Sequence, residues 1–95
     1  MRFILYSKQG CHLCEGLQEK LEEVLKKESF SSVELEVRDI NGREDWYQKY
    51  QYEVPVLYAL DREGSVDGKE LMIPRPSPRV TMTQLEQLLQ KFIKV

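Results

Sequence analysis

The feature that most constrains this chain is a pair of cysteines at the point where a strand-like segment gives way to a helix-like one. Cys11 and Cys14 are the only two cysteines, and they follow a short apolar run at residues 3–6. The first turn of a helix carries unsatisfied N–H groups and partial positive charge, which favour the anion of a thiol placed there. The second thiol lies one turn further along the helix, within reach of the first. The arrangement is suited to reversible dithiol–disulfide chemistry.

Length, composition and charge limit what can surround the cysteines. We expect the 95 residues to form one domain, residues 1–95, with enough core to fold without metal or disulfide support. A disulfide between Cys11 and Cys14 would close a very short loop and add little stability, so reactivity explains the pair better. The net charge is −2 and both signs are interspersed, so the composition gives no sign of binding to nucleic acid or to an anionic membrane.

The first residues give an expectation about location. The apolar run at residues 3–6 is too short for a signal-peptide core, and no stretch approaches membrane-spanning length. We therefore expect a cytoplasmic protein, in which thiols are kept reduced and a disulfide is transient.

Apolar spacing predicts an alternating order of strands and helices. Residues 2–7 are typical of a buried central strand, whereas Val33, Leu35 and Val37 alternate with charged residues as in a half-exposed edge strand. The predicted elements are strands at residues 2–7, 33–37, 56–60 and 71–73, helices at residues 13–27 and 43–51, and a closing amphipathic helix.

Three features of this pattern allow more than one interpretation. Residues 61–68 hold two turn signals, Glu-Gly and Asp-Gly, and the pattern does not choose between them. The closing helix could begin at Thr81 or at Thr83, since each has a capping-box partner three residues later. Four aromatic residues could form a stacking platform for bases, but without a basic surround core packing explains them better. These four residues are Trp46, Tyr47, Tyr50 and Tyr52.

This order of elements resembles the thioredoxin fold, with a Cys-x-x-Cys after the first strand and a Val-Pro before the third. The resemblance implies an α/β protein of order β-α-β-α-β-β-α, with a four-stranded mixed sheet and helices on both faces. Two segments, YSKQGCHLCE at residues 6–15 and YEVPVL at residues 52–57, are similar to small bacterial glutaredoxin-like proteins with a Gly-Cys-His-Leu-Cys motif. The resemblance spans nearly the whole chain.

The resemblance implies roles for the residues of both segments. Cys11 is expected to be the exposed nucleophile that attacks a disulfide, and Cys14 the more buried thiol that resolves the mixed disulfide. The family also implies a cis peptide bond between Val54 and Pro55. That bond would leave the backbone N–H and C=O of Val54 free to pair with an extended substrate.

Lys8 and His12 are the other candidate substrate-binding residues. Lys8 could supply positive charge to the thiolate or bind the carboxylate of glutathione, as its counterpart does in glutaredoxins. An ordinary solvated lysine is an equally good interpretation. His12 lies inside the motif, and we expect it to tune Cys11 electrostatically rather than serve as a passive surface residue.

Partners follow from the same resemblance. We expect a monomer without a bound cofactor or metal, acting on a disulfide-containing protein or a glutathione mixed disulfide, with a thioredoxin- or glutathione-type reductant. Glutathione stays open as a co-substrate, because residues 78–83 lack the Gly-Gly segment and the acidic residue that hold it in glutaredoxins.

Two other functions would use the same cysteines. One is a metal or iron–sulfur carrier that bridges two chains through Cys11, Cys14 and either His12 or glutathione, since one chain alone leaves a four-coordinate site short of ligands. The other is a redox-sensitive adaptor that switches between thiol and disulfide without turnover.

Overall fold

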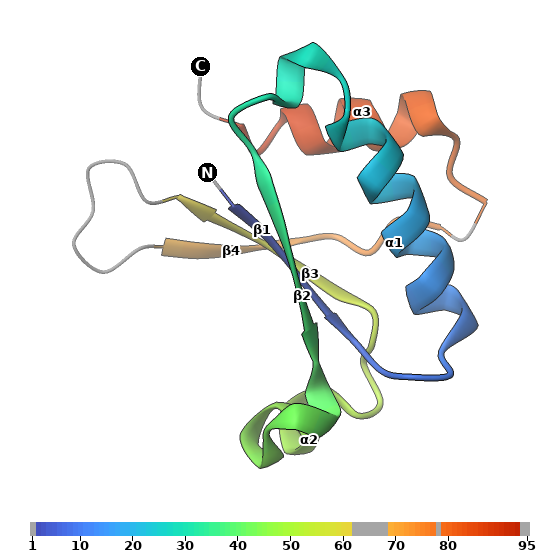
Figure 1. Cartoon of the computed structure of the whole chain (residues 1–95), viewed down its shortest axis with the longest axis vertical. Helices are drawn as coiled ribbons and strands as arrows, with labels where there is room; N and C mark the ends of the chain where they lie inside the picture. Colours follow the sequence, from blue (N-terminus) through green and yellow to red (C-terminus); the bar gives the residue numbers. More distant parts are fainter. Residues whose placement is uncertain (1, 62–68, 78, 94–95) are drawn as a thin grey trace.

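The computed structural model describes residues 2–61, 69–77 and 79–93 (Figure 1). It has the predicted order of strands and helices, with two short 3-10 turns added. The two turn signals, Glu63-Gly64 and Asp67-Gly68, both lie outside the described residues. The elements are β1 (Arg2–Ser7), α1 (His12–Leu25), η1 (Glu28–Phe30), β2 (Glu34–Asp39), η2 (Ile40–Gly42), α2 (Glu44–Tyr50), β3 (Val56–Asp61), β4 (Lys69–Ile73) and α3 (Met82–Gln90).

The four strands form one mixed sheet in the order β2-β1-β3-β4. β1 pairs parallel with β2 and antiparallel with β3, and β3 pairs antiparallel with β4. β1 is therefore central, which explains its buried run, and β2 is an edge strand as its alternating sequence predicted. The thioredoxin-like α/β fold implied by the resemblance is confirmed.

Helices cover both faces of the sheet (Figure 1). On one face, which we call the α1–α3 face, α1 and α3 pack side by side against alternate residues of the strands. The side chains buried there are almost all aliphatic, and Phe3, Leu21 and Leu85 are fully buried. The core of this face consists of Phe3, Leu5, Leu17, Leu21, Val24, Phe30, Val33, Leu57, Ala59, Ile73, Leu85 and Leu89.

The opposite face, which we call the α2 face, has a smaller and more aromatic core. Its buried residues are Ile4, Tyr6, Ile40, Tyr50 and Val56. Tyr6 stacks on Tyr50 with ring centroids 4.3 Å apart and meets Trp46 edge-on at 5.7 Å. The short helix α2 thus holds one end of this face through aromatic contacts.

Several element boundaries differ from the predicted ones for local reasons. α1 ends at Leu25 rather than at residue 27, because Lys27 adopts an extended conformation immediately before η1. β2 begins and ends later than predicted, at Glu34–Asp39. α3 begins after Thr81, whose hydroxyl accepts a hydrogen bond from the backbone N–H of Gln84 at 3.1 Å, which decides between its two candidate starts.

One prediction about a buried side chain is wrong. Tyr52 is 91% exposed rather than packed in the core, because it lies in the turns that follow the end of α2. Leu13, in the first turn of α1, is also largely exposed, at 52%. Within the described part of the chain, every helix is too short or too polar to cross a bilayer.

Candidate active site

A tight turn delivers Cys11 to the start of α1. The backbone N–H of Cys11 donates to the carbonyl of Lys8 at 3.1 Å, closing a four-residue turn. Gly10 has a φ of +83°, the conformation that a type II turn needs at its third residue and that glycine adopts without strain. The glycine before the first cysteine therefore sets the geometry of the site.

Cys11 is the N-cap residue of α1. Its Sγ accepts a hydrogen bond from the backbone N–H of Cys14 at 3.2 Å, so a sulfur atom occupies the place that a hydroxyl or carboxylate oxygen takes in most caps. The Cys11 carbonyl accepts the first helical bond, from Glu15, at 3.0 Å. The first of these contacts points an N–H at the positive end of the helix toward the Cys11 sulfur.

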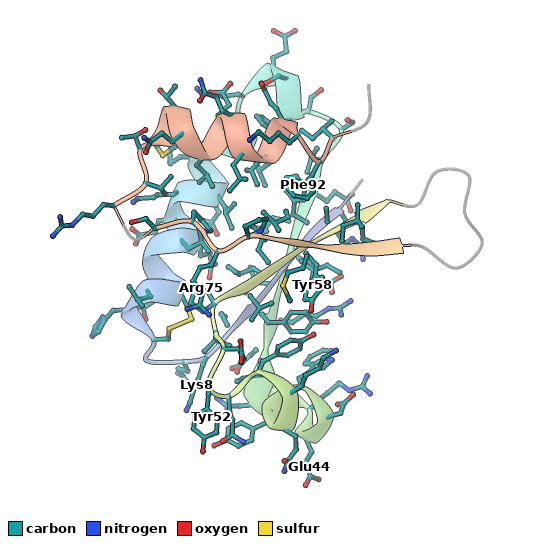
Figure 2. The ribbon with its side chains drawn as sticks, turned by 180° about the vertical axis from the view of Figure 1, so that it is seen from behind. Lys8, Glu44, Tyr52, Tyr58, Arg75 and Phe92 are labelled. Carbon is teal, nitrogen blue, oxygen red and sulfur yellow. A yellow bond between two sulfur atoms is a disulfide. The ribbon has the colours of Figure 1, made fainter. Side chains whose placement is uncertain are left out.

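The two cysteines differ in accessibility. They form a disulfide in the structure, with their Cα atoms 5.2 Å apart, drawn as a yellow bond in Figure 2. Cys14 lies in the first turn of α1 and is 1% exposed, whereas Cys11 is half-buried. A partner molecule approaching from solvent therefore meets the Cys11 sulfur first.

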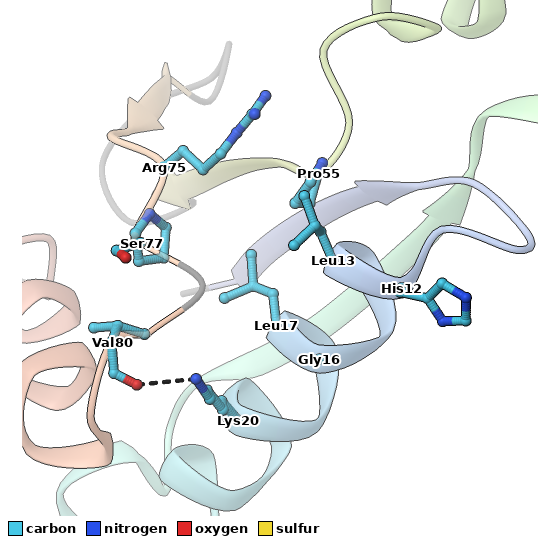
Figure 3. Close-up of a pocket in the computed structure, with 10 residues that line it drawn as sticks. His12, Leu13, Gly16, Leu17, Lys20, Pro55, Arg75, Ser77 and Val80 are labelled. Carbon is cyan, nitrogen blue, oxygen red and sulfur yellow. Dashed lines mark hydrogen bonds between the residues drawn. The ribbon is translucent and has the colours of Figure 1, made fainter.

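His12 and Lys8 flank the disulfide without either being buried. The His12 side chain is 97% exposed, its Nδ1 lies 3.9 Å from Oε2 of Glu15, and its ring points away from the neighbouring cavity (Figure 3). Lys8 Nζ lies 5.7 Å from the ring centroid of Tyr47, close enough for a cation–π contact. The His12 side chain thus lies beside Glu15, and the Lys8 side chain lies beside Tyr47.

The Val54–Pro55 peptide bond is cis, and Pro55 is buried. The backbone N–H of Val54 donates to the carbonyl of Tyr50 at 3.1 Å, so the expectation that this N–H is free for a substrate is wrong. The physical reason is the end of α2, where the last carbonyls lack helical partners and the following turns satisfy them.

Two cavities meet at Pro55. The first, of about 140 Å³, lies between the first turns of α1 and the connector after β4 (Figure 3). The second, of about 360 Å³, lies between the Pro55 loop and the end of β4. Pro55 and Arg75 line both cavities. The first is lined by His12, Leu13, Gly16, Leu17, Lys20, Pro55, Arg75, Pro76, Ser77 and Val80.

Arg75 was not among the site residues predicted from the sequence. Its guanidinium donates from Nη2 to the carbonyl of Glu53, so it reaches from the connector to the loop before Pro55. The sequence did contain a signal for this role, because Arg75 stands between two prolines, Pro74 and Pro76. Such a segment cannot pair with a neighbouring strand, so its side chains are left to make the contacts.

No group of three or more histidine, cysteine, aspartate or glutamate side chains converges on one point among the residues that the structure describes. A metal site built on Cys11 and Cys14 would therefore need ligands from outside this part of the chain, such as the second chain that the carrier hypothesis invokes.

A cysteine pair at the start of α1, a cis-proline that shares a cavity with that helix, and the mixed sheet define a glutaredoxin-like protein of the thioredoxin superfamily. The chain belongs to the Glutaredoxin-like domain family (DUF836), whose family model matches residues 2–90. None of the curated proteins compared with the chain matches it.

Solved structures of other proteins share the fold of this chain. A malarial protein has a TM-score of 0.63 at 16% identity, covering 98% of this chain and 97% of that one. Thioredoxin 1 from Thermosipho africanus TCF52B has a TM-score of 0.61 at 18% identity, covering 97% and 93%. A structural genomics target protein from X. campestris has a TM-score of 0.57 at 22% identity, covering 94% and 96%. At these identities the likeness concerns the fold.

Proposed function

We propose that the protein is a thiol–disulfide oxidoreductase in which Cys11 attacks and Cys14 resolves. The observation that carries the proposal is the hydrogen bond from the Cys14 backbone N–H to the Cys11 Sγ at the start of α1. In the reduced protein the same donor and the helix dipole would stabilise a thiolate at Cys11. The half-buried position of Cys11 leaves that thiolate within reach of a substrate.

The proposed reaction proceeds in two exchanges. The Cys11 thiolate attacks one sulfur of a substrate disulfide, a new Cys11–substrate bond forms, and the other substrate sulfur leaves as a thiolate that takes up a proton. Cys14 then loses its proton and attacks the Cys11 sulfur, which breaks the mixed disulfide and releases the second substrate thiol. Two electrons pass to the substrate, and the Cys11–Cys14 disulfide remains.

The oxidised form must be returned to the dithiol by an external thiol reductant. The substrate would be a disulfide-containing protein or a glutathione mixed disulfide, and the reductant a glutathione- or thioredoxin-type thiol. No bound cofactor takes part in this scheme, because the two cysteines carry both electrons. Cytoplasmic conditions would keep the dithiol form available.

The first test is a disulfide-reduction assay on the wild type, Cys11→Ser and Cys14→Ser, run separately with glutathione and with a dithiol reductant. We expect Cys11→Ser to lose activity under both conditions, because it removes the attacking sulfur. Cys14→Ser should be inactive wherever turnover needs both cysteines, and it should accumulate a mixed disulfide at Cys11. If both variants kept wild-type activity, the proposal would be contradicted.

A second test measures the ionisation of Cys11 directly. The rate of alkylation of reduced Cys14→Ser protein is followed against pH, with Cys11→Ser as the matched control for reaction at position 14. We expect a midpoint below the value of roughly 8.5 that a free cysteine shows. A midpoint at that value, or an unreactive thiol, would remove the physical basis of the mechanism.

A further inference from the structure

Three main-chain groups around the two cavities already have hydrogen-bond partners. The Val54 N–H donates to Tyr50, the Glu53 carbonyl accepts from Arg75, and the Val80 carbonyl accepts from Lys20 Nζ at 2.9 Å. The proline nitrogens of the walls carry no N–H at all. These groups are therefore not open to an extended substrate, and specificity beyond main-chain pairing would come from the side chains of the walls.

The side chains of the walls offer two kinds of contact, apolar and charged. Leu13 is 52% exposed at the mouth of the first cavity, and Leu17 and Val80 continue an apolar surface inward (Figure 3). Apolar walls of this kind favour an apolar side chain, which leaves water on binding. The first cavity therefore fits one aliphatic or aromatic side chain near the substrate cysteine.

Arg75 adds a charge at the wall that the two cavities share. An arginine guanidinium has five N–H donors, and the contact with the Glu53 carbonyl engages one nitrogen at the side of the Pro55 loop. The remaining donors suit a carboxylate, which a guanidinium binds in a planar, two-pronged geometry. Lys20, the other cation lining the first cavity, donates to Val80 instead.

On the basis of the proposed function, we propose that the substrate is a polypeptide disulfide with a carboxylate near its cysteine, which Arg75 binds. An apolar residue would occupy the first cavity. Cavities on both sides of Pro55 favour a chain that continues past its cysteine in both directions. Arg75 is then a specificity-determining residue, and the acidic substrate residue lies close to the disulfide.

The test uses short peptides whose single cysteine carries a neutral thiopyridyl disulfide. Each flanking position holds glutamate in one peptide and glutamine in its pair, and one leucine is kept constant. The reduced protein attacks the peptide sulfur, a Cys11–peptide bond forms, and release of the thiopyridine is followed by absorbance. The proteins compared are wild type, Arg75→Gln, Arg75→Lys and, as a matched control, Arg79→Gln. Arg79 lies in the same connector, is exposed and lines neither cavity.

At low salt, we expect the wild type to react about three- to tenfold faster with the peptide that carries glutamate at the best position than with the matching glutamine peptide. Salt should reduce this ratio, since the guanidinium is exposed. Arg75→Gln should bring the ratio to about one, Arg75→Lys should keep part of it, and Arg79→Gln should leave it unchanged.

The outcomes separate this inference from the function on which it rests. Cys11-dependent exchange with no charge preference in the wild type, or with a preference that survives Arg75→Gln, would overturn the assignment of Arg75 alone. No Cys11-dependent exchange with any peptide would overturn the oxidoreductase proposal, and this inference with it. Because the ratio compares two peptides on one protein, a general loss of stability in a variant does not imitate the expected result.

Discussion

The two faces of the sheet are stabilised in different ways. The α1–α3 face is an aliphatic core, in which Leu21, Leu85 and Leu89 are fully buried between two helices and the strands. The α2 face relies on stacked and edge-on aromatic rings, with Arg38 lying 5.5 Å from the ring centroid of Tyr6 and 5.3 Å from that of Trp46. Ion pairs with Arg2 and Arg38 continue this face along β1 and β2.

The difference bears on the cysteines, which belong to the first of these faces. α1 carries Cys14 and packs against the sheet through fully buried aliphatic side chains, which fix the position of its first turn. Aliphatic cores tolerate little loss of volume, whereas half-exposed aromatic and charged contacts are weaker and depend on solvent conditions. We expect stability to be concentrated on the α1–α3 face and sensitivity to pH on the α2 face.

The largest expected effect comes from truncating one residue on each face. Leu21→Ala should lower the free energy of unfolding by about 2–5 kcal/mol, because it leaves a cavity at a fully buried position. Trp46→Ala should cost at most about 2 kcal/mol, because Trp46 is half-buried and its contacts are edge-on or cation–π. Urea unfolding of the oxidised proteins by far-ultraviolet circular dichroism measures both, since Trp46 is the only tryptophan. An equal or larger loss for Trp46→Ala would break the comparison.

A medium effect tests how α3 is anchored on the α1–α3 face. Thr81→Ala should cost about 1 kcal/mol, because the Thr81 hydroxyl caps the helix and the Thr81 N–H donates to the Gln84 side chain. Thr83→Ala is the control, since Thr83 is exposed inside the helix, and its cost should stay below about 0.5 kcal/mol. Thermal and urea unfolding give the two values, and a reversed order would mean that the helix begins later than the structure places it.

The smallest expected effect concerns acid sensitivity on the α2 face. The hydrogen bond from Arg38 holds the pKa of Glu36 below its ordinary range, against the opposing effect of partial burial, and the charges of Arg38 and Arg2 act in the same direction as the hydrogen bond. A lowered folded-state pKa contributes stability that is present above the ordinary pKa, roughly 4.3, and is lost as pH falls through the lowered value.

Glu36→Gln removes that contribution. At neutral pH the variant should be less stable by well under about 1 kcal/mol, because the Glu36 side chain is 32% exposed and solvent screens its ion pairs. Below pH of about 4.3 the difference from the wild type should shrink. Urea midpoints measured from pH 7 down to pH 3 test this, with Glu34→Gln as control, since Glu34 is 75% exposed and 3.4 Å from Arg2. A difference that grows in acid would contradict the assigned pKa direction.

Local sequence signals predicted most of the fold. The central position of β1 followed from its apolar run, the edge position of β2 from alternation, and the capped start of α3 from one of two threonines. Each of these signals depends on neighbouring residues or on one face of an element, which a sequence displays directly.

The site was predictable only in part, because its walls come from distant segments. The positions of Cys11 and Cys14 at a helix start follow from local pattern, and the structure agrees. Arg75 meets the Pro55 loop only after β3 and β4 have paired, and the hydrogen bond of the Val54 N–H depends on where α2 ends. Tyr52 lies in the turns after α2, and the sequence does not display which side of those turns packs against the sheet.

The contact at the Cys11 sulfur involves an amide of the main chain, and every amino acid except proline has that amide. Under the proposed mechanism, exchanging the side chain at position 14 removes the resolving thiol and keeps the N–H that would stabilise the Cys11 thiolate. Such a protein would stay covalently bound to its natural partners, which makes position 14 the natural handle for isolating them from a cell.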